Sequence, residues 1–121
     1  MRFTPLVVLL ILISLLSACK GDYDKNKAIQ KKKYDSSINE VIKLENEKLA
    51  NESKPEIKRN DTGVVVYNKG ELIWLLYKVE SKEVKSTYLK KDDKYILLDA
   101  TKASDRIDEA KEEYIENLGK K

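Results

Sequence analysis

The chain has no histidine, one cysteine, two prolines and four glycines among its 121 residues. Without histidine, the commonest general base at neutral pH is absent. The single cysteine, Cys19, excludes an internal disulfide, and an unpaired thiol in an exported chain requires a separate explanation. No Gly-x-Ser-x-Gly string supports a serine nucleophile. We therefore assign no catalytic residue and expect a protein that is not an enzyme.

The first 18 residues have the order of a secretory signal peptide. Arg2 supplies a cation, the apolar run "LVVLLILISLL" occupies residues 6–16, and small residues follow. The alternative is a transmembrane helix, which needs about 20 consecutive apolar residues to cross the hydrocarbon core. The run stops short of that length, and Lys20 and Asp22 follow it closely. The pattern therefore favours a cleaved signal peptide.

The stretch Leu16-Ser17-Ala18-Cys19 resembles the bacterial lipobox, in which leucine stands three places before cysteine. The resemblance implies a diacylglyceryl group on the Cys19 thiol and cleavage between Ala18 and Cys19, with optional acylation of the new amine. Two acyl chains hold a protein stably on a membrane, whereas one holds it only marginally. We expect anchoring at the extracytoplasmic face of the cell membrane, membrane lipid as the partner through the anchor, and no other cofactor.

Composition sets the size and the partners of the remainder. Cleavage after Ala18 leaves 103 of the 121 residues, enough for one domain with a modest core. The formal net charge of the whole chain is +3, which is too small to indicate nucleic-acid binding. Lysine outnumbers arginine 21 to 3, a bias that favours a Gram-positive bacterial source. The predicted organisation is a signal peptide (1–18), a lipidated tether (19–27) and a single domain (28–121).

Residues 28–52 have apolar side chains at helical spacing and predict a long N-terminal helix. The apolar stripe consists of Tyr34, Ile38, Val41, Ile42 and Leu49. Ser37 and Glu40 can form a capping box at which the helix starts or restarts, although a continuous helix from about residue 23 fits equally well. The helix should end before Pro55, because proline disfavours helical backbone in the residue that precedes it.

The spacing then changes to that of strands. Four short segments are rich in β-branched or alternating apolar residues: 63–70, 71–80, 84–91 and 94–99. The connections between them are short and contain turn-forming residues, such as Asp92-Asp93, and they predict an antiparallel meander. In the second segment both rows of side chains are apolar, which predicts at least partial cover on both faces. The two rows are Leu72, Trp74 and Leu76, and Ile73, Leu75 and Tyr77.

The C-terminal residues return to helical spacing. Ser104 can cap a helix, with Asp105 favourably placed near its N-terminus. The predicted apolar stripe is Ile107, Ala110, Tyr114, Ile115 and Leu118, with Gly119 as the end. Such a helix would either cover the remaining sheet surface or form a loosely held tail. The predicted fold class is α+β: a long N-terminal helix on a four-stranded antiparallel meander, with a C-terminal helix.

Two charged stretches have features of binding sites. Asp22, Asp24 and Asn26 have the spacing of a calcium loop, but Lys27 and Lys33 stand where that loop needs glycine and glutamate. We therefore predict no metal site. The run from Lys31 to Lys33 is either a solvated helix face or a site of attraction to anionic lipid head groups.

Three stretches, "LSAC", "INEVIKLENEKLANESKPEIKRND" and "YLKKDDKYILLD", resemble small bacterial lipoproteins described as having a cystatin-like fold. The resemblance covers the mature chain to about residue 99 and implies a sheet wrapped around the long helix and a location at the cell surface. That family has no established activity. True cystatins inhibit papain-like proteases through a Gln-x-Val-x-Gly hairpin, and "VVVYNKG" lacks the glutamine, so we do not predict inhibition.

Three functions are compatible with the sequence. The leading hypothesis is a non-enzymatic binding or interaction module whose protein or envelope ligand is unknown, and it predicts an exposed apolar patch or an open pocket. The second is an immunity or exclusion lipoprotein that protects the cell from a toxin or a mobile element. The third is an enzyme that uses paired carboxylates, which predicts a cleft with two acids of perturbed pKa.

Overall fold

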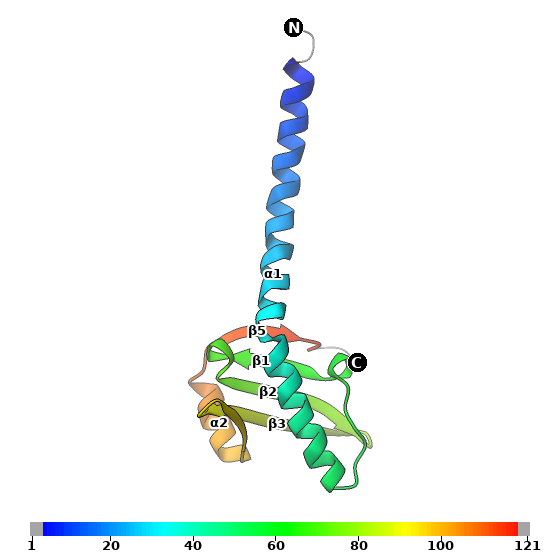
Figure 1. Ribbon diagram of the computed structural model, residues 1–121, viewed down its shortest axis with the longest axis vertical. Coiled ribbons are helices and arrows are strands. Elements are labelled where there is room, and N and C mark those ends of the chain that lie inside the picture. The colour runs from blue at the N-terminus through cyan, green and yellow to red at the C-terminus, as the bar shows by residue number, and fades with distance from the viewer. Residues whose placement is uncertain (1–3, 119–121) are drawn as a thin grey trace. The chain divides into compact units, whose positions relative to one another are not determined.

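The computed structural model describes the backbone of residues 4–118 and the side chains of residues 28–118. The elements run in the order α1 (Thr4–Asn51), η1 (Arg59–Asp61), β1 (Gly63–Tyr67), η2 (Asn68–Gly70), β2 (Leu72–Val79), β3 (Lys82–Lys91), β4 (Lys94–Leu98), α2 (Ala100–Asp108) and β5 (Glu112–Glu116) (Figure 1). The chain divides into two units, residues 1–33 and residues 34–121.

Within the first unit, the described backbone belongs to α1 alone. All six side chains from Ala28 to Lys33 are exposed, and Ile29 retains 62% of its accessible surface. Across the residues whose side chains are described, no helix combines the length and apolarity needed to cross a membrane.

In the second unit, the predicted apolar stripe of α1 is buried. Its five members, Tyr34, Ile38, Val41, Ile42 and Leu49, all belong to the main core. The helix is continuous through Ser37 and Glu40, so the capping box does not start it. It ends at Asn51 with Ser53 in the left-handed region (φ 58°), and the N–H of Lys54 donates to the carbonyl of Leu49 at 2.8 Å. This is a Schellman ending just before Pro55, at the predicted boundary.

The four predicted strands form an antiparallel meander, which a fifth strand extends. The spatial order is β4-β3-β2-β1-β5, with every neighbouring pair antiparallel. Two-residue turns join β2 to β3 at Glu80-Ser81 and β3 to β4 at Asp92-Asp93, and all four residues have positive φ. Two consecutive positive φ angles define the type I′ turn, whose twist matches that of the strands on either side.

The C-terminal prediction was wrong in detail. Helix α2 starts at Ala100, four residues before Ser104, because Asp99 caps it by accepting a hydrogen bond from the N–H of Lys102 at 2.8 Å. It ends at Asp108, and the chain then forms β5. Tyr114 and Ile115, predicted as part of a helical stripe, pair instead with Val66 and Val65 of β1. The open edge of β1 supplies backbone hydrogen-bond partners that no local spacing reveals.

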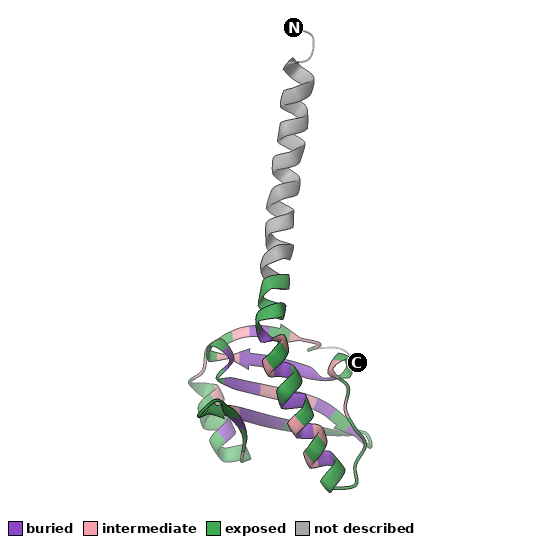
Figure 2. Ribbon diagram, in the orientation of Figure 1, coloured by how far each residue is buried: buried purple, intermediate pink, exposed green. Residues whose placement is uncertain are grey.

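The sheet has two faces with different cover (Figure 2). The α1 face carries alternate residues of each strand, and its buried members include Val64, Val66, Ile73, Leu75, Tyr77 and Tyr88. The α2 face carries the other row, including Val65, Leu72, Trp74, Leu89 and Leu98. Leu72 on this face is only 1% exposed, whereas Trp74 and Leu76 are half-buried. The predicted partial cover on both sides of β2 is therefore confirmed.

Candidate functional site

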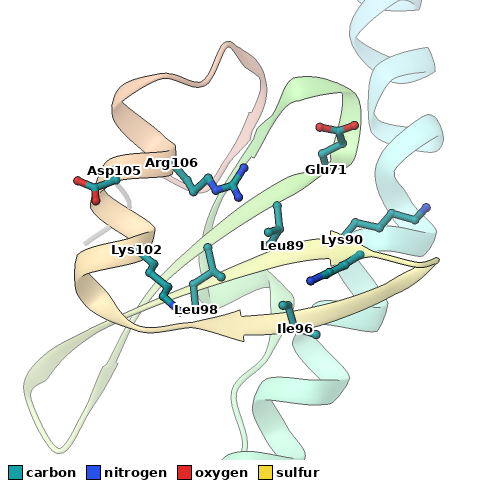
Figure 3. A pocket seen from close by; sticks show the side chains of 9 residues that line it. Glu71, Leu89, Lys90, Ile96, Leu98, Lys102, Asp105 and Arg106 are labelled. Carbon is teal, nitrogen blue, oxygen red and sulfur yellow. The ribbon is translucent and has the colours of Figure 1, made fainter.

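An open groove of about 630 Å³ lies on the α2 face, between α2 and the ends of β3 and β4 (Figure 3). We call it the cationic groove. Its lining residues are Glu71, Leu89, Lys90, Lys91, Ile96, Leu98, Lys102, Asp105 and Arg106. Its volume falls within the range of small-molecule sites.

The groove forms where β4 is followed almost directly by α2. Strand β4 ends at Leu98, Asp99 caps the next element, and α2 begins at Ala100. The register places Ile96 opposite Leu89, so the two apolar side chains share one face of the sheet. On α2, residues 102, 105 and 106 are three and four positions apart and therefore lie on one side of the helix. The apolar part thus comes from the strands, and the helix adds charged groups.

Positive charge predominates around the groove. Four cations and two acids line it, and none of the six forms an ion pair within the described part of the chain. Lys90 belongs to the α1-face row of β3, where its Nζ lies 5.9 Å from the centroid of the Tyr95 ring, so the positive charge inside the groove comes from Lys91, Lys102 and Arg106. Figure 3 shows Arg106 extending toward Leu89 and Glu71, whereas Asp105 points away from them. The groove therefore offers guanidinium and ammonium groups beside an apolar floor.

A second cleft of about 680 Å³ lies near the start of β1 and the end of β2. Its charged lining residues are Glu56, Lys58, Asp61, Lys78 and Glu83. Because three acids and two lysines line this cleft together, it presents no charge of one sign for a ligand to match.

The α1 face holds a fully buried carboxylate, Glu45. It accepts hydrogen bonds from the hydroxyls of Tyr77, Ser86 (2.5 Å) and Tyr88 (2.7 Å), and the Nζ of Lys48 lies 3.6 Å away. Burial acts to raise the pKa of Glu45, but the hydrogen bonds from Ser86, Tyr77 and Tyr88 and the charge of Lys48 outweigh it, so the pKa is lowered. The carboxylate is therefore ionised at neutral pH, and both of its oxygens already accept hydrogen bonds from the protein's own groups.

The pKa values of the tyrosines around Glu45 change in the opposite direction from that of Glu45. Burial, followed by the hydrogen bond and negative charge of Glu45, raises the pKa of Tyr77 and of Tyr88 above the ordinary value of 10.0. Both phenols therefore stay protonated and act as donors. This arrangement stabilises a charge inside the core rather than presenting one to a substrate.

A second internal charge, Arg59, ties three segments together. Its guanidinium donates to both oxygens of Glu116 (Nε 2.9 Å, Nη2 2.5 Å), to Asn39 (3.1 Å), and lies 2.7 Å from Asp35. The hydrogen bond to Glu116 is the main cause that raises the pKa of Arg59 above its ordinary value. Tyr114 also donates to Glu116, at 2.7 Å. This cluster fixes η1 against α1 and β5.

The predicted lipobox, with Cys19 as its lipid attachment residue, lies elsewhere in the chain. Leu16, Ser17, Ala18 and Cys19 fall within the backbone range of α1, but their side chains are outside the described residues. The same holds for Asp22 and Asp24. Among residues 28–118, the structure brings together no group of three or more side chains that would hold a metal ion.

Sequence reasoning missed both the groove and the buried charges. For Glu45 a signal existed, because the apolar stripe of α1 skips from Ile42 to Leu49 and Glu45 occupies the missing position on the same side of the helix. The groove gave no such signal. Its parts come from β3, β4 and α2, and only the fold brings them together.

The fold has a counterpart among solved structures. The chain is similar to a DUF4467 family protein from Staphylococcus aureus subsp. aureus Mu50, with a TM-score of 0.57 and 26% sequence identity, over 69% of this chain and 96% of that one. No family model and no curated protein matches the chain. The likeness supports the α+β arrangement described above, and the name of the neighbour states no activity.

Proposed function

We propose that the protein is a bacterial surface lipoprotein with a non-enzymatic binding domain of cystatin-like type. The single observation that carries the anchor is the stretch Leu16-Ser17-Ala18-Cys19 directly after an apolar run. The chain has no second cysteine, so the proposal also accounts for its only thiol. Modification of Cys19 would hold the domain at the extracytoplasmic face of the cell membrane.

The binding role is supported by the contrast between occupied and available charges. Glu45 and Arg59 are engaged by the protein's own groups. The groove cations Lys91, Lys102 and Arg106 are exposed and lie beside apolar side chains of the groove. An open pocket with a few charged groups around an apolar floor is typical of a ligand site.

The anchor is tested by replacing Cys19 in the full-length chain. We expect Cys19→Ser to remain uncleaved and to take up no labelled fatty acid, whereas the unaltered protein is shortened by 18 residues and labelled. Mass spectrometry of protein purified from the producing cells measures both changes.

Ser17→Ala is the matched control, since it keeps a small side chain at the position before Ala18. We expect it to be cleaved and labelled normally. Fatty-acid labelling that persists in Cys19→Ser would place the lipid on another residue and would overturn the proposal.

A further inference from the structure

We infer that the cationic groove binds a ligand that carries phosphate next to a carbon-rich portion, with Lys91, Lys102 and Arg106 on the phosphate and the apolar floor on the carbon. This inference deepens the proposed binding function and rests on it. It assigns the site and the chemical class of the ligand, neither of which follows from the lipid anchor.

The charge of the groove favours an anionic ligand. An anion binds where cations are available, and the groove cations have no ion-pair partner within the described residues. Arg59, in contrast, is paired with Glu116 and Asp35. The planar guanidinium of Arg106 matches the geometry of phosphate oxygens, and the ammonium groups of Lys91 and Lys102 add positive charge to the same groove.

The apolar floor of the groove favours a ligand that also carries carbon. Leu89 and Leu98 are half-buried, and Ile96 retains 43% of its accessible surface. A free inorganic anion would leave these side chains in contact with water. A ligand with hydrocarbon or glycerol carbons beside its phosphate would cover them and gain the free energy of apolar burial.

The phosphate can come from two sources. A domain held at a membrane surface meets phosphate either in lipid head groups or in soluble phosphodiester polymers. Both present the same chemistry to the groove, a phosphodiester beside glycerol carbons. The experiment therefore offers the two sources separately.

Trp74 is an intrinsic fluorescence probe for the groove. Trp74 is the only tryptophan of the chain, it is half-buried, and it lies on the α2 face. Thr87 is the register partner of both Trp74 and Leu98, so the indole is two strands away from Leu98 of the groove floor. At about 4.8 Å between neighbouring strands, that distance is roughly 10 Å. Occupation of the groove should alter the fluorescence of Trp74.

The experiment uses the full-length lipidated protein in a phosphate-free maltoside detergent. In one arm it is titrated with synthetic poly(glycerol phosphate), and in the other with phosphatidylglycerol added to the micelles. Diacylglycerol, which lacks the phosphate, is the comparator. We expect a saturable change in Trp74 fluorescence in at least one arm, none with diacylglycerol, and weaker binding at higher salt.

The variants test the location. Removing two charge-assisted contacts in Lys102→Gln/Arg106→Gln should weaken binding about tenfold or more. Lys43→Gln is the control, because Lys43 is an exposed lysine of α1 outside the groove, and its affinity should stay within about twofold of the unaltered protein. If the double variant fails to fold, Lys91→Gln alone should still weaken binding, since Lys91 is exposed at the end of β3.

Each outcome decides the inference. A response to the polymer supports a soluble ligand, and a response to phosphatidylglycerol alone supports a membrane ligand. No response in either arm, or equal losses in the groove variants and in Lys43→Gln, overturns the inference. Fatty-acid labelling at Cys19 is measured separately, so failure of the groove does not count against the anchor, or the reverse.

Discussion

The α1 face and the α2 face of the same sheet both carry charged groups, but these groups have different surroundings. On the α1 face Glu45 is completely buried and receives three hydroxyl donors. On the α2 face the groove cations Lys91, Lys102 and Arg106 are exposed and have no ion pair within the described residues. A charge enclosed by its own partners is part of the folded core, whereas a charge left exposed beside apolar groups is available to a ligand.

The largest expected effect comes from emptying the Glu45 site. Glu45→Ala leaves three hydroxyl donors without their acceptor and creates a cavity, so we expect a loss of about 4 kcal/mol in the free energy of unfolding. Urea denaturation of the full-length protein measures it. Glu47→Ala, an exposed position on the same helix, is the control and should change stability by less than about 0.5 kcal/mol.

The same site predicts a dependence on pH. The pKa of Glu45 is lower in the folded protein than its ordinary value of 4.5, so the unfolded chain takes up the proton first as the pH falls. The stabilisation that ionised Glu45 contributes is therefore present above about pH 4.5, and it is lost progressively as the pH falls through the pKa of Glu45 in the folded protein. Glu45→Gln should flatten this part of the stability profile. If the stability of Glu45→Gln depended on pH in the same way as that of the unaltered protein, Glu45 would not be the cause of the pH dependence.

The next effect compares one isoleucine from each face. Ile73, on the α1 face, is fully buried, and Ile96, in the groove, is 43% exposed. Ile73→Ala should cost about 3 kcal/mol through lost burial and a cavity, whereas Ile96→Ala should cost less than about 1 kcal/mol. Both are read from urea denaturation midpoints. Equal costs would show that the groove floor belongs to the core.

The smallest expected effect concerns Arg59 and an exposed pair. Arg59→Gln removes ion pairs to Glu116 and Asp35 at a side chain that is 19% exposed, and we expect a loss of about 2 kcal/mol. Lys85→Gln breaks the exposed pair with Glu83 and should cost less than about 0.5 kcal/mol. Thermal unfolding of both variants makes the comparison. A similar shift in the two would contradict the distinction between enclosed and exposed charges.

Much of the fold could be predicted because its signals are local. The stripe of α1 from Tyr34 to Leu49, the four strands of the meander and the turn at Asp92-Asp93 all follow from spacing over a few residues. The last strand could not be predicted in this way. Residues 107–118 fit a helical stripe, and only the unpaired edge of β1, about fifty residues earlier, makes Tyr114 and Ile115 a strand.

The candidate site divides in the same way. The anchor is predicted from four consecutive residues, Leu16 to Cys19, and these lie outside the residues whose side chains the structure describes. The groove depends on Ile96 lying opposite Leu89 and on α2 beginning immediately after Asp99. Neither the register nor the path of α2 is written in any single segment, so the groove required the three-dimensional arrangement.

The pairing of β5 with β1 also constrains the order of events during folding. Val65 is the register partner of Ile115, so the first strand of the sheet stays open on one side until almost the whole domain is available. An incomplete chain that ends at α2 would present the valine-rich segment of residues 64–66 as a free template for another molecule. We expect such truncated chains to associate with one another, because they lack β5, which pairs with this edge of β1 in the full chain.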